Sequence, residues 1–170
     1  MAVNRARPLL AAAAALLAAA LPVWGAEPEA PAGYLTAIGE ELARLDLHAV
    51  CDDVTGTCSF TRSRSDGVEF QVGVRHGQNT HTVYIFIERY LELSDPDGPS
   101  LALARRLLDL NRQLVTGKFE WEQESNSIRL TAVLSSDSNF DRKAFRSVVL
   151  GLWVVAERLW PELTALAGRV

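Results

Sequence analysis

The strongest hydrophobic pattern in the chain lies in residues 101–115, where apolar side chains recur at spacings of three and four. This period is typical of an amphipathic helix that buries one face. Ser100 precedes the segment and can accept a hydrogen bond from a helix N–H, and Gly117 is a suitable stop. We therefore predict a helix from residue 101 to this glycine. Its apolar stripe comprises Leu101, Ala104, Leu107, Leu108, Leu114 and Val115.

The pattern then changes to alternation in residues 118–123 and 128–134. Phe119 and Trp121 share one face of the first segment, and charged side chains occupy the other. Period-two alternation predicts strands with one buried side, and the polar residues between the segments suit a turn. We therefore expect a β-hairpin directly after the helix.

A helix and a series of strands are predicted before this segment. Residues 34–47 show helical spacing, and residues 48–52, 57–64 and 68–74 have strand patterns separated by glycine-containing turns. In the first helix, Glu40, Glu41 and Arg44 fall opposite the apolar side.

The strand predicted at residues 80–90 is apolar on both faces, so we expect it to be central in the sheet or covered on both sides. One face carries Val83, Ile85 and Ile87, and the other carries Tyr84 and Phe86.

The last predicted helix spans residues 140–160. Residues 148–156 contain no charged side chain, whereas a surface helix would show a polar face there. This helix should be buried on most sides or present apolar surface to a partner. Pro161 should kink or end it, with one more turn to follow.

The predicted order is α-β-β-β(-β)-α-β-β-α, without an internal repeat. Runs of strands with segregated helices indicate the α+β class, with a mostly antiparallel sheet and helices packed on it. The chain has 170 residues and 48% hydrophobic content, which is enough for one domain with a core. We place that domain at residues 34–167.

The N-terminal residues have the pattern of a bacterial signal peptide. Arg5 and Arg7 precede an uncharged Leu/Ala run at residues 9–21, which is short for a membrane span. We predict cleavage after Gly25, with cleavage after Ala26 and an uncleaved anchor as alternatives. Residues 26–33 would then form a flexible leader. The mature protein is expected to be periplasmic or secreted, without a stable membrane span.

Charge argues against one class of partner. The 17 basic side chains fall to 15 when residues 1–25, which hold two arginines and no acid, are removed, so against 21 acids the net charge is −6. Nucleic acids require a basic surface, so we expect no nucleic-acid binding.

Two cysteines, Cys51 and Cys58, have six residues between them. In an oxidising compartment such a pair predicts one disulfide. The alternative is a metal site with His48, His76 and His81, but these spacings match no familiar zinc site. No nucleophile elbow, phosphate-binding loop or zinc-protease motif occurs in the sequence. We therefore expect no catalytic, metal-binding or cofactor-binding residues and no enzymatic activity.

The element order, Leu110–Asn111 in the helix and Gly117-Lys118-Phe119 at the start of the acidic-aromatic strand resemble the YbjN-like family over residues 34–160. Domains of that family are often labelled bacterial sensory transduction regulators, and their fold is similar to that of type III secretion chaperones. The resemblance implies a protein-binding or regulatory module without chemistry. It implies structural roles for Gly117 and for Asn111, whose amide would bond to backbone where the helix meets the hairpin. The signal peptide departs from a cytosolic chaperone role.

The chain has several large aromatic side chains that belong either to the core or to a partner surface. The candidate partner surface comprises Tyr84, Phe86, Tyr90, Trp153 and Trp160. Our first hypothesis is an exported adaptor that binds a protein partner, or a second copy of itself as a homodimer, on apolar surface. The alternative is a small-molecule or lipid carrier with a pocket between the sheet and the last helix. The third hypothesis is an enzyme of unrecognised type.

Overall fold

The structure, a computed structural model, describes residues 33–77, 80–136 and 140–168. The predicted signal peptide and residues 26–32 of the predicted leader lie outside the described residues. The described chain forms helices and strands in the predicted order, with four strands before the second helix. They are α1 (Gly33–Arg44), β1 (Val50–Asp52), β2 (Thr57–Ser63), β3 (Glu69–Gly77), β4 (Thr82–Glu92), α2 (Leu101–Gln113), β5 (Lys118–Glu122), β6 (Ser127–Ser135) and α3 (Arg142–Ala167).

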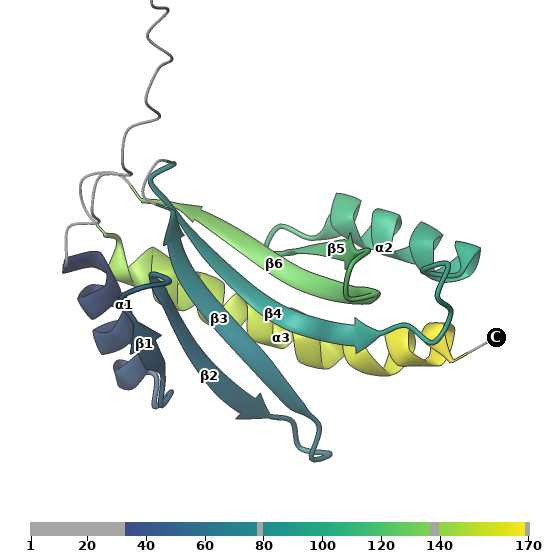
Figure 1. The fold of residues 1–170 in the computed structure, drawn as a ribbon, viewed down its shortest axis with the longest axis horizontal. Coiled ribbons are helices and arrows are strands. Elements are labelled where there is room, and N and C mark those ends of the chain that lie inside the picture. The colour runs from purple at the N-terminus through teal and green to yellow at the C-terminus, as the bar shows by residue number, and fades with distance from the viewer. Residues whose placement is uncertain (1–32, 78–79, 137–139, 169–170) are drawn as a thin grey trace, which may run out of the picture.

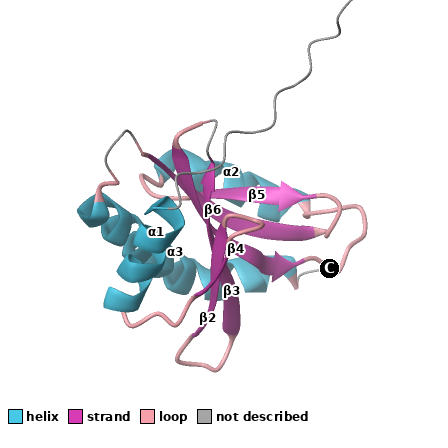
Figure 2. Cartoon of the chain, turned by 60° about the vertical axis from the view of Figure 1, so that its left-hand side comes forward, coloured by secondary structure: helices cyan, strands magenta, loops and turns pink. Residues whose placement is uncertain are grey.

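The six strands form one antiparallel sheet in the order β1-β2-β3-β4-β6-β5. In Figure 1, α3 runs behind the sheet, α1 lies beside β1 and β2, and α2 lies beside β5. Figure 2 shows α1 and α3 together on one side of the sheet. The predicted α+β fold with an antiparallel sheet is therefore confirmed.

The core fills the space between the sheet and the helices. β4 contributes Val83, Ile85 and Ile87, each at most 1% exposed. The last two lie in the layer that also contains Val149 and Leu152 of α3. The alternation in β4 thus places one of its two apolar faces against the helices, as its period requires.

The sequence prediction for α2 was wrong in its end and in its buried stripe. The helix ends at Gln113, because Leu114 adopts an extended conformation. Its buried residues are Leu103, Leu107 and Leu110. The stripe predicted around them is largely outside the core: Leu101 and Leu108 are exposed, and Val115 is 100% exposed. Ser100 caps the helix as predicted, with its Oγ accepting from the N–H of Leu103 at 3.3 Å.

Two other helix ends also differ from prediction. α1 ends at Arg44 rather than residue 47, since Asp46 takes a positive φ of 59°. α3 continues through Pro161 to Ala167. Proline lacks the N–H that would bond to the carbonyl of Glu157, four residues earlier. The guanidinium of Arg64 donates to that carbonyl at 2.9 Å, which replaces the missing bond.

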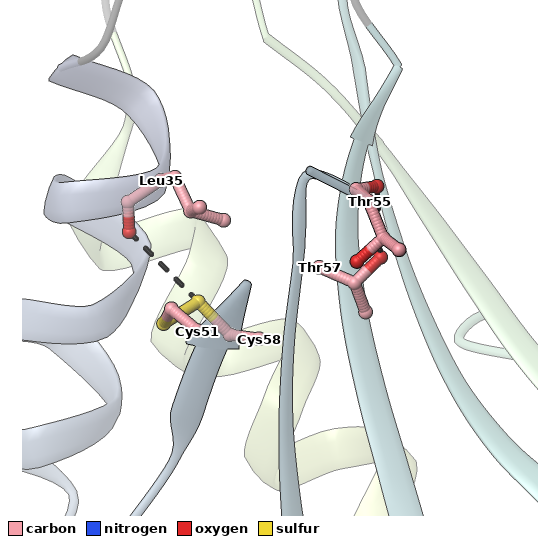
Figure 3. The surroundings of a disulfide bond; sticks show 5 residues. All are labelled: Leu35, Cys51, Thr55, Thr57 and Cys58. Carbon is pink, nitrogen blue, oxygen red and sulfur yellow. Dashed lines mark hydrogen bonds between the residues drawn. A yellow bond between two sulfur atoms is a disulfide. The ribbon is translucent and has the colours of Figure 1, made fainter. Parts of the chain in front are cut away.

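The predicted disulfide is present between Cys51 and Cys58, which are directly opposed in the β1–β2 ladder. Figure 3 shows it beside α1, where the Cys58 sulfur lies 3.9 Å from the carbonyl oxygen of Leu35. A Cβ at Gly39 would stand 3.3 Å from the Cys51 sulfur. This close approach of helix and disulfide accounts for a glycine inside α1.

Candidate protein-binding surface

One face of the sheet carries no helix in the described part of the chain, and we call it the open face. Its side chains include Ser59, Thr61, Gln71 and Arg75, all of which are exposed. The sequence predicted that β4 would be central or covered on both sides. β4 is central, between β3 and β6, but only one of its apolar faces is covered. Its other face, with Tyr84 and Phe86, is half-exposed.

Three side chains form an apolar patch at the centre of the open face: Tyr84, Phe86 and Val133, which we call the open-face patch. Tyr84 is directly opposite Val133 in the β4–β6 ladder, and Phe86 is two residues further along the same face. Val133 is 56% exposed. Directly opposed and diagonal neighbours on one sheet face are within reach of aromatic side chains, so the three form one continuous surface.

Phe86 is held in place by a glycine on the neighbouring strand. Gly73 pairs with Phe86 in the β3–β4 ladder. A Cβ built at Gly73 would lie 2.3 Å from two atoms of the Phe86 ring. The ring therefore lies across the bare backbone of β3, and any larger residue at Gly73 would displace it. The open-face patch is thus a built feature rather than a loose aromatic side chain.

Tyr84 has polar partners at its phenol end. Hydrogen bonds from the hydroxyls of Thr82 and Thr80, and the charge of Arg75, lower the pKa of Tyr84 despite an opposing effect of desolvation. Arg75 is also its direct cross-strand neighbour. The phenol is therefore tied at the rim, while the ring contributes apolar surface.

A charged cluster borders the patch. Arg129 lies 2.7 Å from a carboxylate oxygen of Glu122, 3.1 Å from one of Glu120 and 3.9 Å from one of Glu88. One guanidinium facing three carboxylates leaves an excess of negative charge. Thr131, between this cluster and the patch, also donates to Glu120 at 2.9 Å. The open face therefore combines an apolar centre with an acidic cluster on the β5 side, and partner surfaces often have such a polar rim.

The prediction that Tyr90 and Trp153 belong to a partner surface was wrong. Tyr90 is 0% exposed, and its hydroxyl donates to the carbonyl of Ala156 at 2.8 Å. Burial raises the pKa of Tyr90. Trp153 is 7% exposed, and the guanidinium carbon of Arg62 lies over the Trp153 ring, 4.3 Å from the ring centroid. Both side chains point to the helix-covered side of the sheet, where they serve as core.

Trp160 is half-buried on the same side of the sheet, among aromatic side chains. Its ring contacts Phe70 and Tyr90 at centroid distances of 4.9 and 5.3 Å. Of the five residues predicted as partner surface, the structure therefore brings only Tyr84 and Phe86 together on the open face. Val133 completes that patch, and the sequence analysis assigned it no role.

Asn111 makes the backbone contacts that the family resemblance implied. Its side-chain oxygen accepts from the N–H of Phe119 at 2.7 Å, and its amide donates to the carbonyl of the same residue at 2.8 Å. Lys118 donates to the carbonyls of Asn111 and Leu114 at the end of α2. Gly117, with a φ of 86°, makes the turn between α2 and β5. These residues hold the edge strand β5 against α2.

Glu41 is a buried charge that sequence analysis placed on the exposed side of α1. It is 0% exposed and pairs with Arg142 at 2.8 Å, with Arg44, and with Arg146 at 3.5 Å. The hydrogen bond from Arg142, together with Arg44 and Arg146, holds the pKa of Glu41 below its usual range although burial opposes the shift. The cluster joins α1 to the start of α3, and we assign it a structural role.

The structure also brings together a histidine and a serine. His76 and Ser136 lie 3.4 Å apart between Nε2 and Oγ, but the other ring nitrogen of His76 has no hydrogen-bond partner among the described residues. Tyr34 stacks on the ring at 4.2 Å. Burial, and then the charge of His81, lower the pKa of His76. A nucleophilic serine needs a base that a third group orients, and no residue that the structure describes orients His76 in this way.

The alternative of a carrier requires an apolar pocket. Between the sheet and α3 the structure holds a cavity of about 10 Å³, lined by Ile85, Ile87, Leu152 and neighbours. Ligand pockets are usually several hundred Å³. The packed core of the described chain therefore gives no support to a carrier.

The residues that the structure describes contain neither a candidate metal site nor a candidate membrane span. No group of three or more histidine, cysteine, aspartate or glutamate side chains there is placed to hold a metal ion. Both cysteine sulfurs are used in the disulfide. No helix in the described ranges has the length and apolar character needed to cross a bilayer.

Several solved structures share this fold. A chain of the HopA1–SchA chaperone–effector complex is 17% identical, with a TM-score of 0.56 over 76% of this chain and 93% of that chain. A chain of the ExsC–ExsE complex is 14% identical, with a TM-score of 0.56 over 80% and 95%. A chain of the heterodimeric ExoU–SpcU complex from the type III secretion system of Pseudomonas aeruginosa is 16% identical, with a TM-score of 0.50 over 78% and 99%.

These likenesses confirm the predicted type III secretion chaperone-like fold. No protein-family model matches the chain, and no curated protein matches it in sequence. The resemblance to the YbjN-like family therefore stays a prediction.

Proposed function

We propose that this protein is an exported, non-enzymatic adaptor of the YbjN-like type that binds a partner protein on the open face of its sheet. The observation that carries the proposal is β4, a central strand with apolar side chains on both faces and a helix layer on only one. Half-exposed Tyr84 and Phe86, together with Val133, leave apolar surface that the described chain itself does not cover. Such surface on a soluble protein usually marks an interaction site.

The partner is expected to be a protein with apolar side chains at its centre and basic ones at its border. The apolar requirement comes from the open-face patch. The basic requirement comes from Glu88, Glu120 and Glu122, which outnumber the single Arg129 among them. The fold neighbours come from complexes of two proteins, which supports a protein partner. Export rests on the predicted signal peptide.

Site-specific crosslinking tests this proposal. The full chain, with its own N-terminal residues, would carry a photoreactive phenylalanine analogue in place of Phe86 in its native host. Thr61, which is exposed on the same face, would carry the same analogue in a matched control. We expect a discrete protein adduct in the exported fraction from position 86 and none from position 61.

The adduct should depend on the patch itself. Adding Tyr84→Asp to the chain that crosslinks at position 86 should remove the adduct, while circular dichroism and the thermal midpoint stay close to those of the parent. The proposal fails if position 86 yields no discrete adduct, or if both positions yield the same adducts. Fractionation of the same cells tests export: retention of the chain in the cytoplasm would contradict that part.

A further inference from the structure

The edge of the sheet beside β6 is only half covered. β6 pairs with β4 as far as Ser135, whereas β5 pairs with it only from Ser127 to Thr131. Within the described chain, residues 132–135, which we call the β6 half-edge, therefore have a strand on one side only. Figure 1 shows β6 extending beyond the start of β5. Backbone N–H and C=O groups alternate sides along a strand, so some in this segment face the open side.

The other two edges of the sheet are protected. The outer edge of β5 is sealed at Phe119, whose N–H and carbonyl both bond to Asn111. β1 is three residues long and is tied to β2 by the Cys51–Cys58 disulfide. Natural sheets also protect edges with charge or proline. The half-edge, Ala-Val-Leu-Ser, has neither.

The half-edge also borders a depression. Its volume is about 270 Å³, and its lining includes Val115, Val133 and Val148. Val115 is 100% exposed. Lys118 also lines the depression, but its ammonium group bonds to the carbonyls at the end of α2. Thr116, Glu120 and Thr131 line it as well. The space beside the half-edge is therefore open to solvent, with valines and polar groups both along its sides.

We propose that the β6 half-edge accepts an extended segment of the partner protein with apolar side chains at alternate positions, which adds a strand in line with β5. Unpaired backbone groups at strand spacing are satisfied by another extended backbone, and this is the basis of recognition by strand addition. The valines that line the depression select apolar side chains at alternate positions. The leader of this chain is a poor occupant, because Pro28 and Pro31 lack the N–H that a strand needs.

This inference rests on the proposed function and names how the partner is held. It is tested separately from the open-face patch with the mature chain and a defined probe. The probe is acetyl-Lys-Thr-Val-Thr-Val-Thr-Lys-amide, titrated to about 1 mM while backbone amide signals are followed by NMR. Its control is the same peptide with alternate backbone nitrogens methylated, so that one edge cannot donate hydrogen bonds.

We expect the probe to slow hydrogen exchange at least tenfold for those amides of residues 132–135 that face the open side, and the methylated peptide to have no such effect. Val115→Lys should weaken probe binding at least fivefold, because it places charge in the depression without touching the open-face patch. Val154→Lys is the matched control, since Val154 is exposed on α3 and outside the depression. Its affinity for the probe should equal that of the wild type.

The inference is overturned if the probe does not bind, if the methylated peptide binds equally well, or if the probe protects amides elsewhere in the sheet. A dimer that forms without probe and disappears in Val115→Lys would assign the half-edge to a second copy and also overturn it. The two proposals can also fail separately. If the probe does not bind and the chain with Val115→Lys still crosslinks at position 86, strand addition is refuted but the adaptor function is not.

Discussion

Replacing Asn111 with alanine should destabilise the fold through one strand. The side chain of Asn111 presents an acceptor and a donor to the N–H and the carbonyl of Phe119, at 2.7 and 2.8 Å. Phe119 is 5% exposed and lies in β5, whose other side pairs with β6. The side-chain amide of Asn111 thus satisfies the outer backbone groups of Phe119, as a neighbouring strand would. Alanine removes both bonds and leaves two backbone groups without their partners.

The expected size follows from these two bonds. Each contributes about 1 kcal/mol net, and a buried group left without a partner adds to the loss, so Asn111→Ala should lower the free energy of unfolding by about 2–3 kcal/mol. For a domain of this size, the thermal midpoint should fall by roughly 6–9 °C. Urea unfolding followed by circular dichroism measures the change, and the slope of the free energy against urea should stay that of the wild type.

Two variants make the measurement specific. Asn111→Asp keeps the acceptor for the N–H of Phe119 but cannot donate to its carbonyl, so its loss should be intermediate. Gln113→Ala removes an exposed hydrogen bond to Asp109 and should change stability by less than about 0.5 kcal/mol. A loss below about 0.5 kcal/mol for Asn111→Ala, or equal losses for Asn111→Ala and Gln113→Ala, would refute the reasoning.

Three further predictions concern the disulfide, the patch and the buried charge. Cys51→Ser should lower the free energy of unfolding by about 2.5 kcal/mol on the chain-entropy model, given a sequence separation of 7; a thiol reductant should lower the urea midpoint of the wild type but leave the variant unchanged. Gly73→Ala should destabilise by roughly 1–2 kcal/mol because the new Cβ meets the Phe86 ring; adding Phe86→Ala should restore most of this in thermal melts, and additive losses would contradict the contact. Arg142 and its neighbours lower the pKa of Glu41, so its stabilisation is present above about pH 4.3 and is lost as pH falls through the folded pKa. Glu41→Gln should therefore be less stable than the wild type near neutral pH, the difference should close in acid, and urea midpoints that differ equally at every pH would contradict this.

The order of elements could be predicted because period and turn chemistry are local. The change from helical to alternating spacing around Gly117 marks α2 and β5, and both were found. The phase of α2 could not be predicted in the same way. Leucines lie on more than one side of the segment, and burial of Leu103 and Leu110 rather than Leu101 and Leu108 is set by contacts with β5 and α3. Asn111 fixes that rotation, since its side chain must reach Phe119.

Contacts between distant segments account for the other differences. Glu41 has a charged residue's usual place in an amphipathic pattern. Its burial is made tolerable by Arg44, by Arg146 and above all by Arg142, 101 residues later. A charge paired in this way satisfies the requirement for burial, but no local signal indicates it. Pro161 is a comparable case. A proline normally ends a helix, and only the guanidinium of Arg64, from a turn between strands, lets α3 continue.

Only part of the candidate site could be predicted from the sequence. Apolar residues on both faces of β4 were visible, and the aromatic pair Tyr84 and Phe86 was selected from them. The absence of a helix over the open face, and the difference in length between β5 and β6, are properties of the assembled sheet. They meet at Val133, which belongs both to the open-face patch and to the β6 half-edge.

A partner strand beside residues 132–135 would extend the open face by one strand and place its own side chains next to Val133. The two surfaces would then act as one site, with backbone pairing setting the register of the partner and the patch selecting its side chains. For that reason, a partner crosslinked at position 86 should lose affinity on Val115→Lys, although Val115 lies outside the patch.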